Sequence, residues 1–124
     1  RTLPNDPVKA HRHYEGPCPA PYFTADAMHW VVEREVTSLV VDLPSLDRAD
    51  DGGGLVAHRT YWGLAPGVRD AQLARRGRAL VTELAYMPRE VADGLYLLDL
   101  HVPAVGADAA PSRPVIYPVQ ELSP

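Results

Sequence analysis

Two residues in the middle of the sequence, His58 and Glu83, have side chains that could take part in hydrolytic chemistry. His58 follows an acidic, glycine-rich stretch at 50–54 and precedes an aromatic pair at 61–62. We expect a loop after a buried strand to present it, and a histidine placed there can bind a metal or act as a general base. Glu83 lies in an otherwise apolar segment, where an ionised carboxylate is costly unless it meets a cation or several donors. The residues alone leave a structural histidine and an ordinary, partly exposed carboxylate equally open.

The other histidines and the single cysteine are weaker candidates. His11 and His13 form an H-x-H pair that could bind one metal, but prolines surround it and we expect a solvated loop. We expect His29 on the surface of a helix, and His101 in a structural role at the end of a strand. Cys18 lies between two prolines with no activating cation nearby, so we interpret it as an incidental thiol that has no internal disulfide partner.

The composition limits the classes of function. A chain of 124 residues that is 46% hydrophobic fits one ordinary domain with a core. Its net charge of −4, without a cluster of Lys and Arg, gives no basis for binding nucleic acid or an anionic membrane. No apolar run approaches the roughly 20 residues of a membrane span, and no signal peptide opens the chain. Together with the single cysteine, this favours a cytoplasmic location.

The chain begins with an irregular segment and then a helix. Prolines interrupt residues 1–22, which we expect to be a connector from an upstream part, because the sequence starts at Arg1 rather than Met. Residues 23–124 would then form the domain. A helix should begin after Thr24, a good N-cap, with Asp26 in its first turn. The residues spaced for its buried stripe are Ala27, Val31 and Arg34, with Trp30 alongside.

Four segments after this helix have strand character, and 63–78 should be a loop. The expected strands are 38–42, 79–87, 95–102 and 114–119. The first is nearly continuous and apolar, which indicates burial on both faces. The third alternates, with residues 96, 98 and 100 on one face. The fourth should lie at an edge, because Pro118 cannot donate to a ladder. We therefore expect an α/β or α+β domain, with α/β favoured, in which one main helix packs on a mixed sheet of about four strands.

In this order, the segments resemble the second half of the cyclase family of metal-dependent hydrolases, the kynurenine formamidase-like amidases. In that family a helix and a strand lead to a D-x-P-S-x-D turn, an A-H pair, a strand with a glutamate, and a closing A-P-x-R-P segment. The resemblance covers about Pro19 to Pro118. The motifs that carry it here are Trp30-Val31-Val32-Glu33, Asp42-Leu43-Pro44-Ser45-Leu46-Asp47, Ala57-His58, Thr82-Glu83-Leu84 and Ala110-Pro111-Ser112-Arg113-Pro114.

The resemblance implies roles for individual residues. His58 and Glu83 would be ligands of Zn²⁺ or Mn²⁺, and the metal would activate a water that attacks an amide, formamide or cyclic amide. Asp42, Ser45 and Asp47 would shape or hydrogen-bond the site. The family also implies a layered β/β/α fold and association into homo-oligomers.

The sequence departs from the family in two respects. The interval from His58 to Glu83 is longer than in the best-known formamidases, and the upstream H-x-G-T-H-x-D-x-P motif is missing. We therefore expect a C-terminal part of such a domain, a partial domain that needs an upstream part or a second chain to complete the site. The alternative is a non-catalytic binding or assembly domain that keeps the fold.

Overall fold

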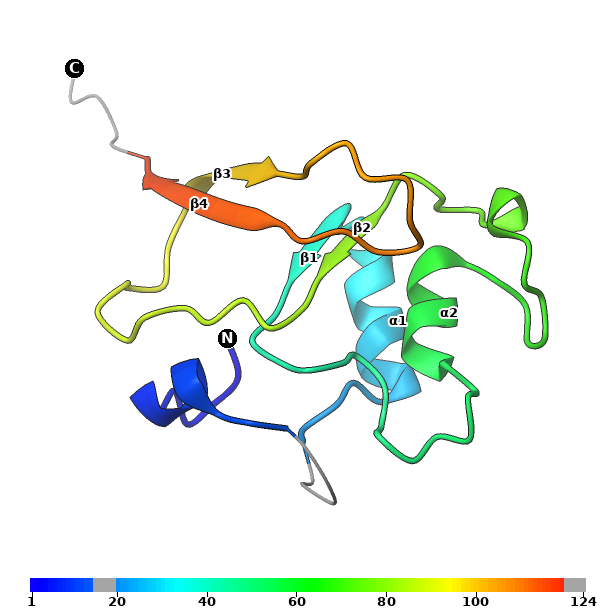
Figure 1. The fold of residues 1–124 in the computed structure, drawn as a ribbon, viewed down its shortest axis with the longest axis horizontal. Helices are drawn as coiled ribbons and strands as arrows, with labels where there is room; N and C mark the ends of the chain where they lie inside the picture. Colours follow the sequence, from blue (N-terminus) through cyan, green and yellow to red (C-terminus); the bar gives the residue numbers. More distant parts are fainter. Residues whose placement is uncertain (15–19, 120–124) are drawn as a thin grey trace. The chain divides into compact units, whose positions relative to one another are not determined.

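The computed structural model describes residues 1–14 and 20–119 (Figure 1), and these divide into two compact units, one up to Pro88 and one from Arg89 on. The elements of the first are η1 (Pro7–His11), α1 (Ala25–Glu33), β1 (Ser38–Val40), α2 (Val56–Trp62), η2 (Ala71–Leu73) and β2 (Leu80–Thr82); those of the second are β3 (Tyr96–His101) and β4 (Arg113–Pro118). Cys18 lies outside the described residues, and the expected boundary after residue 22 stays a prediction. No described helix has the length and apolar character needed to cross a membrane.

Helix α1 begins where the sequence predicts but buries a different stripe. The Thr24 hydroxyl accepts a hydrogen bond from the Ala27 N–H at 3.2 Å, which confirms the N-cap. The buried residues are Met28 and Val31, whereas Ala27 and Arg34 are exposed, so the expected stripe is wrong at both of its ends. Methionine has far more apolar surface to remove from water than alanine, and the helix is rotated accordingly.

Strands β1 and β2 form a parallel pair, in register from Ser38 opposite Leu80 to Val40 opposite Thr82. A parallel pair joined through a helix is the expected α/β pattern. The single sheet of about four strands is wrong, however, because the described strands form two separate two-stranded sheets. β2 is short because Leu84 takes a left-handed φ of 55° and its N–H turns to the Leu43 carbonyl.

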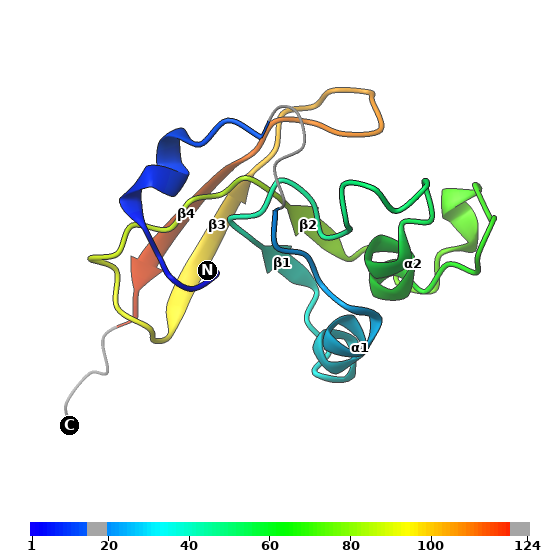
Figure 2. The same cartoon turned by 90° about the horizontal axis from the view of Figure 1, so that it is seen from below.

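Helix α2 corrects the expectation that a loop presents His58. Ala57 and Tyr61, four positions apart, are both fully buried, and Gly63 ends the helix with a left-handed φ of 67°. α1 and α2 lie side by side next to the β1–β2 pair in both views (Figures 1 and 2). The buried apolar residues of this unit are Met28, Val31, Val41, Leu43, Leu46, Ala57, Tyr61 and Ala79.

The second unit is an antiparallel pair, β3 and β4, with Leu98 opposite Ile116. The expected alternation along β3 is present: Tyr96 and Leu100 are partly buried, and Leu98 is 37% exposed against 63% for Leu97. Both strands are edge strands, which agrees with the position of Pro118 at the end of β4.

The first residues of the chain bind the carboxyl end of the β1 segment. The Asp42 carboxylate, with a side chain only 1% exposed, accepts hydrogen bonds from the Thr2 N–H (2.9 Å) and hydroxyl (3.0 Å). Lys9 Nζ lies 3.1 Å from the other Asp42 oxygen and also donates to the Thr2 carbonyl. A segment that we expected to be irregular is therefore fixed by one buried ion pair.

This ion pair should make the attachment of the first residues to Asp42 depend on pH. Burial raises the pKa of Asp42, but the hydrogen bonds from Thr2 and Lys9 and the charge of Lys9 outweigh it and hold the pKa below its usual value. A pKa that is lower in the folded than in the unfolded protein gives stability above the unfolded value of about 3.9, and this stability is lost as pH falls through the folded value. Asp42→Asn should lower the free energy of unfolding at pH 7 by about 1–3 kcal/mol.

The measurement is urea unfolding between pH 7 and pH 3. The loss of stability over this range should be smaller in Asp42→Asn than in the wild type, because one of the responsible carboxyls is gone. Asp108→Asn, at an exposed position, is the control and should follow the wild type. Identical pH profiles for Asp42→Asn and the wild type would show that the Asp42 ion pair does not fix the segment.

Candidate functional site

The turn after β1 places the Asp47 carboxylate beside the first turn of α2. Leu46 is fully buried, and its carbonyl accepts a hydrogen bond from the Phe23 N–H at 2.8 Å. The Asp47 N–H donates to Ser45 Oγ at 3.1 Å. The turn is thus held by a buried side chain and by local hydrogen bonds, so that Asp47 has a defined position.

Asp47 serves as the N-cap of α2 although it lies well before the helix in sequence. Leu55, at the N-cap position, has a left-handed φ of 48° and no side-chain cap. Asp47 Oδ1 accepts from the Ala57 N–H at 2.5 Å and Oδ2 from the His58 N–H at 3.2 Å. These are the N–H groups that a capping side chain normally satisfies, and the helix dipole favours an anion there. Asp47, expected at the site from its motif, therefore has a capping role that the sequence did not predict.

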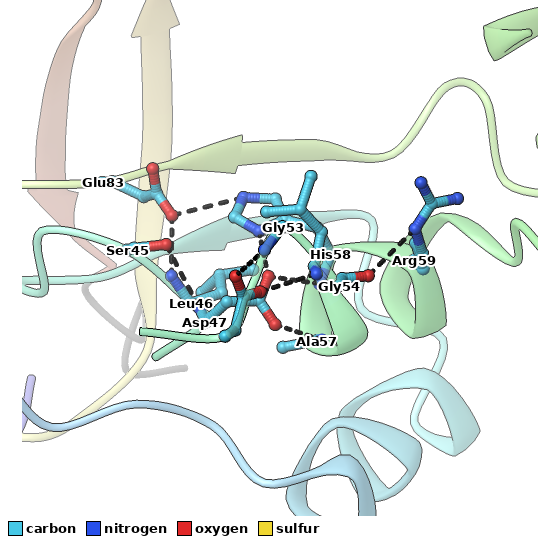
Figure 3. Close-up of polar contacts among 11 residues, drawn as sticks. Ser45, Leu46, Asp47, Gly53, Gly54, Ala57, His58, Arg59 and Glu83 are labelled. Carbon is cyan, nitrogen blue, oxygen red and sulfur yellow. Dashed lines mark hydrogen bonds and ion pairs between the residues drawn. The ribbon is translucent and has the colours of Figure 1, made fainter. Parts of the chain in front are cut away.

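The imidazole of His58 lies between two carboxylates (Figure 3). Nδ1 is 2.6 Å from Asp47 Oδ2, and Nε2 is 3.3 Å from Glu83 Oε1. The His58 side chain is 15% exposed, and the Trp62 ring covers it with 5.3 Å between ring centroids. Glu83 is itself held, because its Oε1 accepts a hydrogen bond from the Leu46 N–H at 2.8 Å.

This arrangement favours a positive charge on the His58 ring or beside it. A neutral imidazole has one N–H and one lone pair, so in either tautomer it turns a lone pair toward a carboxylate, Nε2 toward Glu83 or Nδ1 toward Asp47, which is repulsive. Either a second proton on the ring or a cation between Nε2 and Oε1 removes that repulsion. Burial lowers the pKa of His58, but hydrogen bonding and charge from Glu83 and Asp47 outweigh it, so that the pKa is raised.

The same two atoms have a spacing that suits a metal ion. Two ligands bound to a tetrahedral Zn²⁺ at about 2.0–2.1 Å lie about 3.3 Å apart, and His58 Nε2 and Glu83 Oε1 are separated by 3.3 Å. Asp47 on Nδ1 corresponds to the outer carboxylate that orients a metal-binding histidine. Within residues 1–14 and 20–119, however, no group of three or more His, Cys, Asp or Glu side chains is arranged to hold a metal. The chain therefore offers a pair of ligands.

The structure gathers most, but not all, of the residues that the sequence analysis assigned to the site. Ser45, Asp47, His58 and Glu83 are linked by the contacts described above, with Ser45 joined through the Asp47 backbone. Asp42 instead uses its carboxylate to bind Thr2 and Lys9. The N–H of Leu46, which orients Glu83, was missed, and its backbone carries no sequence signal.

The remaining histidines lie at the surface. His11, His13 and His29 are exposed, as we expected for His29. His101 is exposed too, and its Nε2 lies 2.8 Å from Asp99 on the same strand. Alternate residues of a strand point to one face, which accounts for this pair. None of these four takes part in the contacts around His58.

Replacement of Asp47 should cost stability in the first unit. Asp47→Ala removes the cap of α2 and the partner of the His58 ring, and we expect the free energy of unfolding to fall by about 2–3 kcal/mol. Urea unfolding followed by circular dichroism measures this loss. Asp50→Ala is a matched control, because Asp50 is 80% exposed and pairs only with the exposed Arg48. Equal stability of the two variants would contradict the capping role.

Comparisons with models of protein families, with curated proteins and with solved structures found no match to the chain. The resemblance to the cyclase family thus rests on the quoted motifs. Three of its expected site residues, Asp47, His58 and Glu83, lie in contact in the structure.

Proposed function

We propose that this chain is part of a cyclase-like, metal-dependent hydrolase that cleaves the C–N bond of an amide, formamide or cyclic amide. The observation that carries the proposal is the 3.3 Å separation of His58 Nε2 and Glu83 Oε1, with Asp47 on the far side of the ring. A histidine and a carboxylate at the spacing of two metal ligands, with a second carboxylate behind the ring, are the ligand types that such an enzyme uses.

Each residue has a distinct part in this proposal. His58 and Glu83 would hold Zn²⁺ or Mn²⁺, which supplies a bound water of lowered pKa. Asp47 fixes the orientation of the ring through Nδ1, and the Leu46 N–H fixes Glu83. Trp62 packs beside the imidazole, with 5.3 Å between the ring centroids. Ser45 keeps the Asp47 turn in place.

The proposed site is completed by groups from elsewhere. A catalytic zinc usually has three protein ligands, and His58 and Glu83 provide a pair. The remaining ligands would come from an upstream part of the same protein or from a second chain, within a layered β/β/α fold and a homo-oligomer. The substrate would be a small molecule, and the proposed location is the cytoplasm.

A second candidate is a non-catalytic binding or assembly domain. The raised pKa of His58 favours it, because a protonated imidazole between Asp47 and Glu83 satisfies both carboxylates without any metal. In that case the contacts that look like half of a metal site would serve only to join α2 to the turn after β1 and to β2.

Metal titration separates the two candidates. We expect Zn²⁺ or Mn²⁺ to bind the protein, measured by calorimetry in the presence of its upstream part, and a formanilide-type amide to be hydrolysed. His58→Ala and Glu83→Gln should each weaken metal binding by at least about 100-fold, and Asp47→Asn by about 10–100-fold. His101→Ala is the control and should bind like the wild type, because His101 is exposed and, among the described residues, pairs with Asp99 alone.

Two results would count against the hydrolase. If His58→Ala and Glu83→Gln bound metal as tightly as the wild type, the ligand assignment would be wrong. If the wild-type protein bound neither ion, the binding or assembly domain would be the better description.

A further inference from the structure

A cavity of about 710 Å³ lies in the first unit, and it is lined by residues other than those of the His58 site. Its lining comes from α1, the C-terminal part of α2 and the segment 63–76. Arg59, Arg75, Arg76 and His29 contribute basic side chains, while Val32 and Leu73 are among several apolar residues. No Asp or Glu of the described residues lines the cavity. Its volume is in the range of sites for small organic ligands, about 300–1,000 Å³.

Arg59 is held in place by uncharged partners. Its Nε donates to the Gly54 carbonyl at 3.0 Å, and its Nη1 to the carbonyls of Ala65 (2.9 Å) and Val68 (2.8 Å). These bonds tie Gly54, just before α2, and the loop after α2 to the guanidinium. Because a carbonyl carries no net charge, they leave the positive charge of Arg59 without an ionic partner among the described residues.

Arg76 is held in the same way. Its Nη1 donates to the Tyr61 carbonyl at 2.6 Å, Nη2 donates to the Val36 carbonyl, and the guanidinium lies 4.7 Å from the centre of the Tyr61 ring. A ring face attracts a cation only weakly compared with a carboxylate. Two fixed, uncompensated cations thus line one cavity.

Arg75 differs because its guanidinium has no fixed partner. Its side chain packs closely against Gly63. A Cβ added at Gly63 would lie 3.1 Å from both Cβ and Nε of Arg75. Arg75 forms neither a hydrogen bond nor an ion pair with any residue in the described part of the chain. The donors of its planar guanidinium, which suit the two oxygens of a carboxylate or phosphate, are therefore available.

We propose that this cavity binds a small organic anion, an apolar body that carries a carboxylate or a phosphate. The anionic group would lie on Arg75 and be attracted by the charges of Arg59 and Arg76. The apolar body would contact residues such as Val32 and Leu73. Basic groups without a neighbouring acid favour an anion over a neutral ligand, and the apolar lining favours an organic anion over a bare inorganic ion.

The test is a calorimetric titration of the full chain with phenyl phosphate, benzoate and benzyl alcohol, which share one ring and differ in charge. We expect the two anions to bind at least about tenfold more tightly than the alcohol, and their binding to weaken as salt is added. Whichever anion binds more tightly identifies the preferred group, phosphate or carboxylate.

Variants of Arg75 locate the site. Arg75→Ala should weaken binding of the anions by at least about tenfold, the loss expected for a charge-assisted hydrogen bond. Arg75→Lys should restore part of it, because the charge returns without the planar geometry. Arg78→Ala is the matched control, an exposed arginine that follows the lining segment and does not line the cavity. Arg75 is exposed and lacks a hydrogen bond, so its replacement should leave thermal unfolding unchanged.

Three results would overturn the proposal. Benzyl alcohol could bind as tightly as the anions, so that charge plays no part. Arg78→Ala could weaken binding as much as Arg75→Ala, which would reveal only the net charge of the surface. The third such result is that neither anion binds at millimolar concentration.

Discussion

The first unit depends on the contacts of one group, the Asp47 carboxylate. One side chain, 5% exposed, caps α2 through two backbone N–H groups and binds the ring of His58. Without it, the first turn of α2 would leave buried donors unsatisfied, because Leu55 provides no side-chain cap. The same contact joins α2 to the turn after β1, and so brings the helix beside α1. The position of α2 and the orientation of the His58 ring therefore depend on the same carboxylate.

That coupling explains why His58 faces Glu83. Asp47 holds the near side of the imidazole, and the Leu46 N–H holds Glu83 on the far side, from neighbouring positions of one turn. Two carboxylates on either side of a largely buried ring create a demand for positive charge. A proton meets that demand in a structural histidine, and a metal ion meets it in a hydrolase. The proposed hydrolase and the alternative binding domain thus differ in whether a metal ion or a proton balances the two carboxylates.

The arginine-lined cavity shows the opposite imbalance. Around His58 the fixed charges are negative, whereas Arg59, Arg75 and Arg76 face a space with no described acid. The chain has a net charge of −4, so this basic cavity does not reflect an overall excess of arginine and lysine. It arises because Arg59 and Arg76 are held by backbone carbonyls, Arg59 by those of the loop after α2 and Arg76 by those of Val36 and Tyr61, and a carbonyl does not neutralise their charge.

The sequence by itself determined the start of α1 at Thr24, the strand character near 38–42 and 95–102, and the identity of His58, Glu83 and Asp47 as candidates. These depend on local signals: a capping hydroxyl, apolar runs and alternation, and motif spacing. It did not reveal α2, although Ala57 and Tyr61 have helical spacing, because the helix lacks a local cap and its cap comes from Asp47 across the turn. Nor did it reveal the binding of Asp42 to Thr2 and Lys9, or the division into two sheets. Each of these depends on contacts between residues far apart in sequence, which periodicity and propensity do not encode, so only the tertiary structure decided them.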